Sequence, residues 1–427
     1  MNRQGEPNLD SSFDNDPAKA VGRKSLVALM GPAFVAAVAY VDPGNVAANI
    51  TAGSRYGYAL VWVLVLANFM AMLIQYESAK FGIVTGKSLP EMLGSRLKKR
   101  SRLAFWVQAE LVAAATDLAE VMGGAIALNL LFHTPLLVGG VIVGAVSIAL
   151  LALQNTSGQI VFERIVMGLL LIITLGFVGG LVVAPPQWQA AVAGLRPTFP
   201  SSDSVLVAAS MLGATVMPHA IYLHSSLTKD RHGHEEDNVW KRRILKATKL
   251  DVFWALLIAG SVNISLVLLA ASALQGDHGG IETDTIDGAY QVIAQALGMG
   301  VATVFAVGLL ASGLASTSVG AYAGSEIMHG LLKIHVPLLA RRLVTLIPAL
   351  VILAIGFEPT WALVLSQVLL SLGIPFALIP LVVYTSRRDI MGEFADPKPL
   401  LAINIIVAGL IIALNLGLLV LSFTGAG

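Results

Sequence analysis

The chain has 427 residues, of which 56% are hydrophobic and only 12% are charged, and its formal net charge is +1. A soluble globular protein carries about 25% charged residues, so this chain has too little charge to cover a water-exposed surface. The balanced charge gives no global field for nucleic acid. The composition therefore excludes a soluble enzyme, a nucleic-acid-binding protein and a disordered chain, and it indicates a membrane protein. The absence of cysteine also excludes disulfides and thiolate metal sites.

Eleven apolar segments are long enough to cross a bilayer, because a spanning helix needs about 20 mostly apolar residues. We expect the polar residues 1–24 to form a disordered cytoplasmic tail and residues 25–427 to form a single transmembrane domain. The sequence thus predicts an all-α polytopic membrane protein. Its spans are expected near residues 26–54, 58–82, 103–132, 135–153, 161–184, 203–227, 250–274, 298–330, 340–356, 360–385 and 400–423.

Lysine and arginine are distributed unevenly between the two sides that these spans define. With the N-terminus inside, 25 of the 27 basic residues fall on the cytoplasmic side, and only Arg55 and Arg196 fall on the other. Cytoplasmic loops of membrane proteins carry such an excess. The sequence therefore predicts a cytoplasmic N-terminus and, with eleven spans, an extracytoplasmic C-terminus. The short tails favour a bacterial inner membrane.

Helix-breaking prolines stand inside the first and the sixth span, at Pro43 and Pro218. Proline removes a backbone donor and clashes with the carbonyl one turn back, and in lipid the freed carbonyls need another partner. Five spans separate the two breaks, so the second half of the chain starts from the opposite side. We therefore expect an inverted repeat, about 26–184 against 203–385, with an additional helix at 400–423. Matching interrupted spans point to a transporter's midplane site.

The residues around the two breaks offer an unusual set of metal donors. Asp42 is a carboxylate in an apolar span, where a charge costs about 2.5–3.5 kcal/mol on insertion scales, and a cation is its natural partner. Asn45 adds an amide oxygen, Met217 adds a thioether, and the carbonyls of Ala39 and Ala214 are freed at the breaks. Mg²⁺ and Ca²⁺ prefer oxygen alone, whereas a thioether favours softer transition metals. The predicted cargo is Mn²⁺ or Fe²⁺.

Three acidic residues follow one face of the third span. Asp117 and Glu120 are three residues apart, and Glu110 precedes Asp117 by seven, so the three side chains form one stripe. Ionisable residues inside a membrane commonly form proton routes. The alternative is a structural network in which Arg341 and Arg342, at the start of the ninth span, neutralise these acids.

Other polar residues near the breaks carry weaker predictions. His219 suits a proton relay or gate because histidine titrates near neutral pH, although it is also compatible with a structural role. Asn263 and Gln367 are candidates for the site or for hydrogen bonds between helices. Thr215 is expected to bond back to its own helix, and Asn68 to brace the second span.

The two proline motifs, 42–45 (DPGN) and 217–219 (MPH), resemble the signatures of the Nramp (natural resistance-associated macrophage protein) family of divalent metal transporters. The flanking segments 53–58, 108–120, 213–216 and 366–367 agree, and the resemblance runs from about residue 28 to 420. It implies the LeuT-type fold, with eleven helices, a 5+5 inverted repeat and helices 1 and 6 broken.

The resemblance also implies a function and roles for several residues. Bacterial members of the family are proton-coupled manganese importers that work by alternating access. By this resemblance Gln367 joins the metal shell when the outside closes, and Asp117 leads protons to the cytoplasm in one network with Arg341 and Arg342. Members that carry Mg²⁺ or Al³⁺ depart at the methionine position, whereas this chain keeps Met217.

The predicted function is proton-coupled import of Mn²⁺, Fe²⁺ or a similar divalent metal. Metal ions and protons are the expected partners, with no permanent cofactor, no enzymatic activity and no obligatory protein partner. A cation-coupled amino-acid symporter of the same fold is the alternative, although Asp42 would repel a substrate carboxylate. A passive channel and an intramembrane metalloenzyme are further alternatives; the metalloenzyme would need a histidine-rich cluster inside the spans.

Overall fold

The computed structural model describes residues 29–233, 237–276, 281–334, 336–356 and 359–424, so the predicted tail 1–24 lies outside it. The described residues form helices and no strand, which confirms the all-α prediction. In chain order the helices are α2 (Pro32–Val38), η2 (Ala39–Val41), α3 (Pro43–Tyr56), α4 (Val61–Thr85), α5 (Leu89–Arg96), α6 (Lys99–Phe132), α7 (Leu136–Ser157), α8 (Gln159–Val183), α9 (Trp188–Ala193), α10 (Ser202–Thr215), α11 (Pro218–His232), α12 (Asn238–Ala273), α13 (Ile286–Leu297), α14 (Met299–Leu332), α15 (Leu338–Ala354), α16 (Pro359–Ser386), α17 (Arg388–Met391), η3 (Gly392–Phe394) and α18 (Lys398–Thr424).

Eight helical segments of the described chain are long and apolar enough to cross a membrane. The remaining three predicted spans are also helical, but α2 and α3 are divided by a break, α15 has 17 residues, and α16 contains two internal prolines. The chain is therefore a multi-pass membrane protein, and the number of eleven spans stays a prediction.

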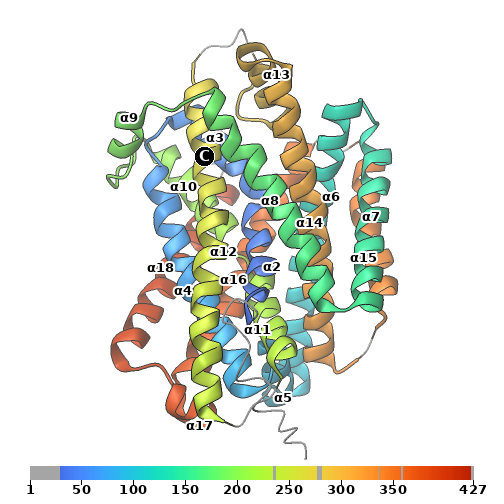
Figure 1. Cartoon of the computed structure of the whole chain (residues 1–427), viewed down its shortest axis with the longest axis vertical. Helices are drawn as coiled ribbons and strands as arrows, with labels where there is room; N and C mark the ends of the chain where they lie inside the picture. The colour runs from blue at the N-terminus through green and yellow to red at the C-terminus, as the bar shows by residue number, and fades with distance from the viewer. Residues whose placement is uncertain (1–28, 234–236, 277–280, 335, 357–358, 425–427) are drawn as a thin grey trace, which may run out of the picture.

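The helices run along one direction in a bundle, with short helices at its two ends (Figure 1). One end carries α9 and α13, and the other, which we call the basic end, carries α5 and α17. α18 lies beside α10 and α16, whereas α7 and α15 pair on the opposite side of the bundle. α6 and α14 have 34 residues each and so span about 51 Å. They therefore exceed the roughly 30 Å of a bilayer's hydrocarbon core.

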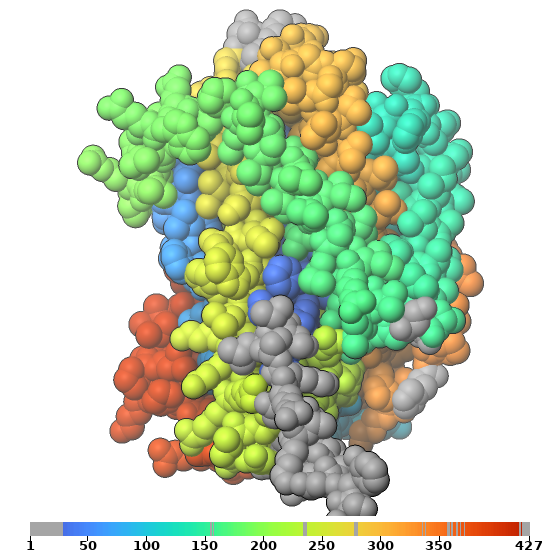
Figure 2. Space-filling view, viewed as in Figure 1, coloured from blue at the N-terminus to red at the C-terminus, as the bar shows by residue number. Residues whose placement is uncertain are grey.

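The outside of the bundle is apolar, as lipid contact requires. Leu171, Val182 and Ile406 are more than half exposed, with relative accessibilities of 58%, 83% and 68%. Charge is found inside instead, where the Arg342 side chain is fully buried. In the space-filling view α2 is visible between α8 and α12, so the first broken helix is flanked by longer ones (Figure 2).

The break in the first span begins where η2 ends. Asp42 adopts an extended conformation (φ −67°, ψ 165°) and caps α3, and Pro43 takes the first helical position, where its missing N–H costs nothing. Gly123 allows α6 to approach the break closely, because a Cβ at this position would lie 2.2 Å from the Pro43 ring. Larger residues at 123 would push α6 away from the break.

The second break has the same form. α10 ends at Thr215, Val216 and Met217 are extended, and α11 begins at Pro218. Both predicted breaks are therefore present, and each second half starts with proline.

Candidate metal site and proton pathway

The two breaks meet through one amide side chain. The Asn45 Nδ2 group donates to Asp42 Oδ1 at 2.6 Å and to the carbonyl oxygen of Ala214 at 2.9 Å. The backbone N–H of Asn45 also donates to Asp42 Oδ1, at 2.9 Å. Three predicted site residues from both halves of the chain thus converge, although 169 residues separate Asn45 from Ala214.

The second carboxylate oxygen of Asp42 faces a different neighbour. Oδ2 is buried and makes no comparable hydrogen bond among the described residues. A Cβ on Gly44 would lie 3.1 Å from this oxygen and 2.0 Å from Nε2 of Gln367. The Gln367 amide of α16 therefore packs against the backbone of Gly44, beside the Asp42 carboxylate.

Met217 and Ala39 stand at the two breaks. Met217 is the extended residue between α10 and α11, and Ala39 is the first residue of η2. Both are buried in one apolar cluster, with 0% and 1% of their surface exposed. Among the described residues no three carboxylates or imidazoles gather into a metal cluster. A cation here would therefore depend on amide, carbonyl and thioether donors in addition to Asp42.

Two other carbonyls at the first break are already occupied by side chains. Asn263 Nδ2 of α12 donates to the Tyr40 carbonyl at 2.7 Å, and Ser312 Oγ of α14 donates to the Val41 carbonyl at 2.5 Å. Asn263 in turn accepts a hydrogen bond from Asn49 at 2.8 Å. Asn263 thus holds the open backbone in shape. Sequence reasoning missed Ser312 and Asn49, because small polar residues in spans carry no distinctive signal.

A chain of three polar groups connects the first break to the second broken helix. Gln75 Nε2 of α4 donates to the Tyr40 hydroxyl at 2.7 Å, and Gln75 Oε1 lies 2.8 Å from Nδ1 of His224. All three residues are buried. Sequence reasoning gave no role to Gln75 or Tyr40. The only available signal was that Gln75 and His224 are polar residues in apolar spans.

The acids of α6 pair with the arginines of α15. Arg341 Nη2 lies 2.6 Å from Glu110 Oε1, and Arg342 Nη1 lies 2.7 Å from Asp117 Oδ1. Glu120 is fully buried, and a Cβ on Gly320 of α14 would lie 2.8 Å from its Oε2. The five predicted residues therefore form one charged seam between α6, α14 and α15. Conduction of protons along this seam stays a prediction.

The remaining candidates lie as follows. His219 is the second residue of α11, is 2% exposed, and makes no hydrogen bond through its ring within the described part of the chain. Thr215 donates to the Met211 carbonyl at 2.6 Å, within its own helix. Asn68 packs against Gly260 of α12, where a Cβ would lie 2.4 Å from its amide. The geometry thus places Thr215 and Asn68 in structural contacts.

A multi-pass helical bundle in which two matching helices are broken around a buried carboxylate has the architecture of a membrane transporter of the LeuT type. Residues 33–421 match the family model described as natural resistance-associated macrophage protein-like. The match covers most of the chain, which therefore belongs to the Nramp family.

Relatives of known name support this assignment over nearly the full length. The chain is 54% identical over 397 residues to the divalent metal cation transporter MntH of Mycobacterium tuberculosis (strain ATCC 25618 / H37Rv), covering 93% of this chain and 92% of the relative. It is 44% identical over 406 residues to MntH of Bacillus subtilis (strain 168), covering 95% of each.

Solved structures agree. The fold matches the Eremococcus coleocola manganese transporter in complex with an aromatic bis-isothiourea substituted compound, with a TM-score of 0.84 and 31% identity over 92% of this chain and 86% of that one. A weaker match to Mhp1, a nucleobase–cation symporter, has a TM-score of 0.58 at 17% identity over 92% of this chain and 91% of that one, and shows a common fold only. The predicted LeuT-type fold is confirmed, and the chain is a transporter and not an enzyme.

Proposed function

We propose that the protein imports Mn²⁺, and related divalent metals such as Fe²⁺, together with protons by alternating access. The observation that carries this proposal is the junction of the two breaks. There Asn45 joins the Asp42 carboxylate to the Ala214 carbonyl inside a buried apolar cluster. The names of the relatives, divalent metal cation transporter and manganese transporter, support the same class of cargo.

The Asn45 amide nitrogen holds the position that a cation would take. It lies between two oxygens, Asp42 Oδ1 and the Ala214 carbonyl, at 2.6 and 2.9 Å. A metal ion would replace these two hydrogen bonds, and rotation of the amide would then present its oxygen to the ion. Met217 would supply the thioether that disfavours Ca²⁺ and Mg²⁺. Gln367, beside Gly44, would complete the shell together with the Ala39 carbonyl.

The distribution of basic residues supports an orientation of the protein in the membrane, and an inward proton gradient would then drive import. We assign the basic end of the bundle to the cytoplasm, because 25 of the 27 lysines and arginines belong to the predicted cytoplasmic side. A bacterial inner membrane is the matching location. Protons would leave the site through Glu120 and Asp117 towards this end, with Arg342 and Arg341 setting the charge of the route and His219 gating it.

The proposal is tested by Mn²⁺ uptake into proteoliposomes across an inward proton gradient. We expect the Asp42→Asn variant to bind and transport no measurable Mn²⁺, because the carboxylate charge at the junction is lost. Asp389→Asn, at an exposed carboxylate that pairs with Arg387, is the matched control and should transport normally. Normal uptake by a folded Asp42→Asn variant would refute the site.

A further inference from the structure

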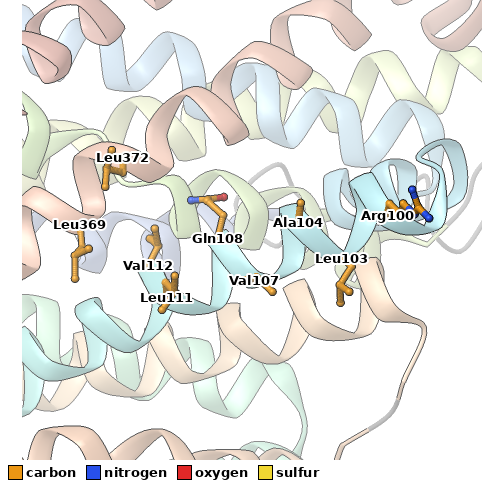
Figure 3. A pocket seen from close by; sticks show the side chains of 9 residues that line it. All are labelled: Arg100, Leu103, Ala104, Val107, Gln108, Leu111, Val112, Leu369 and Leu372. Atoms are coloured by element: carbon orange, nitrogen blue, oxygen red, sulfur yellow. The ribbon is translucent and has the colours of Figure 1, made fainter.

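A groove runs along the outer surface between α6 and α16. Its volume is about 520 Å³. Its walls are aliphatic, and the side chains of Leu103, Val107 and Leu111 are 49%, 44% and 59% exposed. Figure 3 shows these side chains in a row along α6. Arg100 lies at one end of the row, which we call the near end, and Leu369 and Leu372 of α16 lie at the other, the far end.

The length of this groove corresponds to one leaflet of a bilayer. Arg100 and Val112 are twelve residues apart on α6, which is about 18 Å along a helix. Half of the hydrocarbon core of a bilayer is about 15 Å thick. With Arg100 at the membrane interface, the far end of the groove would lie near the midplane.

Positive charge is concentrated at the near end. Lys98, Lys99, Arg100 and Arg102 lie within five positions at the start of α6. The Arg100 side chain is exposed and has no ion-pair partner among the described residues. A guanidinium at the interface pairs well with a phosphate, often through two hydrogen bonds, and basic residues at this depth attract anionic lipids.

The groove combines an apolar channel of leaflet length with an unpaired cation at its interfacial end. We propose that it binds one anionic phospholipid, with the phosphate on Arg100 and one acyl chain along α6 as far as Leu369 and Leu372. A zwitterionic lipid carries the same phosphate, but its ammonium group opposes the attraction to the basic residues. A free anion would gain only the contact with Arg100.

The far end of the groove adjoins the second helix break. Gly373 of α16 packs so closely here that a Cβ would lie 3.0 Å from both the Gln108 amide and the Pro218 ring. Gln108 lines the groove, and Pro218 begins α11. Only one layer of side chains would thus separate the end of the acyl chain from the break. The acyl chain would also contact α16, the helix that carries Gln367.

The proposal is tested with phosphatidylglycerol that carries a photoactivatable group near the end of one acyl chain. The full-length protein is reconstituted in nanodiscs, irradiated and mapped by peptide mass spectrometry. We expect crosslinks concentrated on residues 107–112 and 369–372. Crosslinks spread evenly over the apolar surface, or absent from these two segments, would overturn the proposal.

Two matched pairs of variants separate the headgroup from the chain. By native mass spectrometry, Arg100→Gln should weaken phosphatidylglycerol binding about fivefold and should weaken phosphatidylcholine binding less, because the choline cation opposes the attraction of its phosphate to Arg100. Lys99→Gln, which removes the same charge one residue outside the groove, should have a smaller effect. Ala104→Trp should block the groove, whereas Ala413→Trp on the exposed face of α18 should not. Equal effects within either pair would overturn the site. Because lipid binding is measured without metal, this result is independent of the proposed transport.

Discussion

The contact between Gly44 and Gln367 gives the sharpest test of how the metal shell is assembled. Gly44→Ala adds one methyl group, which would lie 2.0 Å from Nε2 of Gln367 and 3.1 Å from Oδ2 of Asp42. No side chain tolerates a contact of 2.0 Å, so the Gln367 amide has to move. Because that amide is the end of a flexible side chain, the backbone of both helices can stay in place.

We expect Gly44→Ala to weaken Mn²⁺ binding while changing the stability of the apo protein little. Gly44 is helical, and alanine is favoured over glycine in a helix by up to about 1 kcal/mol, which offsets the lost contacts of the amide. We therefore expect the stability of the apo protein to change by less than about 1 kcal/mol. Moving the Gln367 amide away removes its contact with the bound metal ion, and a polar contact to a charged group contributes about 1.5–3 kcal/mol. The Kd for Mn²⁺ should therefore rise about 10- to 150-fold.

The assay is Mn²⁺ binding by isothermal titration calorimetry, carried out as a double-mutant cycle with Gln367→Ala. In the Gln367→Ala background the methyl group meets no amide, so Gly44→Ala should have almost no further effect on the Kd. If the two substitutions weaken binding additively, Gly44→Ala does not act through the Gln367 amide, and the displaced-amide explanation is wrong.

Three further predictions concern other parts of the molecule. Met217→Leu keeps the volume of a fully buried side chain but removes the sulfur, so discrimination of Mn²⁺ against Ca²⁺ in competition uptake should fall about tenfold, or roughly 1.4 kcal/mol. Asp117→Asn leaves Arg342 buried without its partner and should lower the free energy of unfolding by about 3–5 kcal/mol. Adding Arg342→Gln should recover stability in thermal unfolding without restoring acidification of the vesicles. Glu91→Gln breaks a 2.8 Å ion pair with Lys229 and should cost about 1 kcal/mol at pH 7, after allowance for solvent screening.

The last of these effects depends on pH in a defined direction. Burial alone would raise the pKa of Glu91, but the Lys229 ammonium and the backbone N–H of Ser88 outweigh burial and lower the pKa below its ordinary value. A carboxyl whose pKa is lowered by folding stabilises the protein above its unfolded pKa, about 4.3. This contribution is lost as the pH falls through the folded pKa. The thermal stabilities of the Glu91→Gln variant and the wild type should therefore approach each other as the pH falls below about 4.3, and a constant difference would contradict the ion-pair explanation.

The sequence predicted the parts of this fold that depend on local chemistry. Runs of apolar residues predict helices in lipid, because a helix satisfies its own backbone there. Pro43 and Pro218 predict the breaks because each removes a helical hydrogen bond wherever the surrounding chain folds. The proximity of Asp42 and Asn45 also followed from the local sequence, because residues three apart lie on one helical turn.

The contacts that shape the breaks were beyond reach of such reasoning. Asp251 of α12 accepts hydrogen bonds from the backbone of Gly31 and Ala33, and so caps the start of α2 from 218 to 220 residues away. Ser312 binds the Val41 carbonyl from 271 residues away. Serine and asparagine occur throughout such spans as ordinary helix-to-helix donors. Their composition and spacing therefore do not reveal which of them face an open carbonyl.

These distant contacts restrict how the first broken helix can move. α12 holds the start of α2 through Asp251 and the following η2 turn through Asn263, so α12 is coupled to the chain on both sides of α2. The bond from Ser312 to Val41 comes from α14, a different element. Alternating access requires the broken helices to move relative to some of their neighbours. The two bonds to α12 are compatible with joint motion, whereas a displacement of α2 relative to α14 has to stretch or replace the bond from Ser312. The break is thus the point at which such motion would be resisted, and the candidate metal ligands Asp42 and Asn45 lie directly beside it.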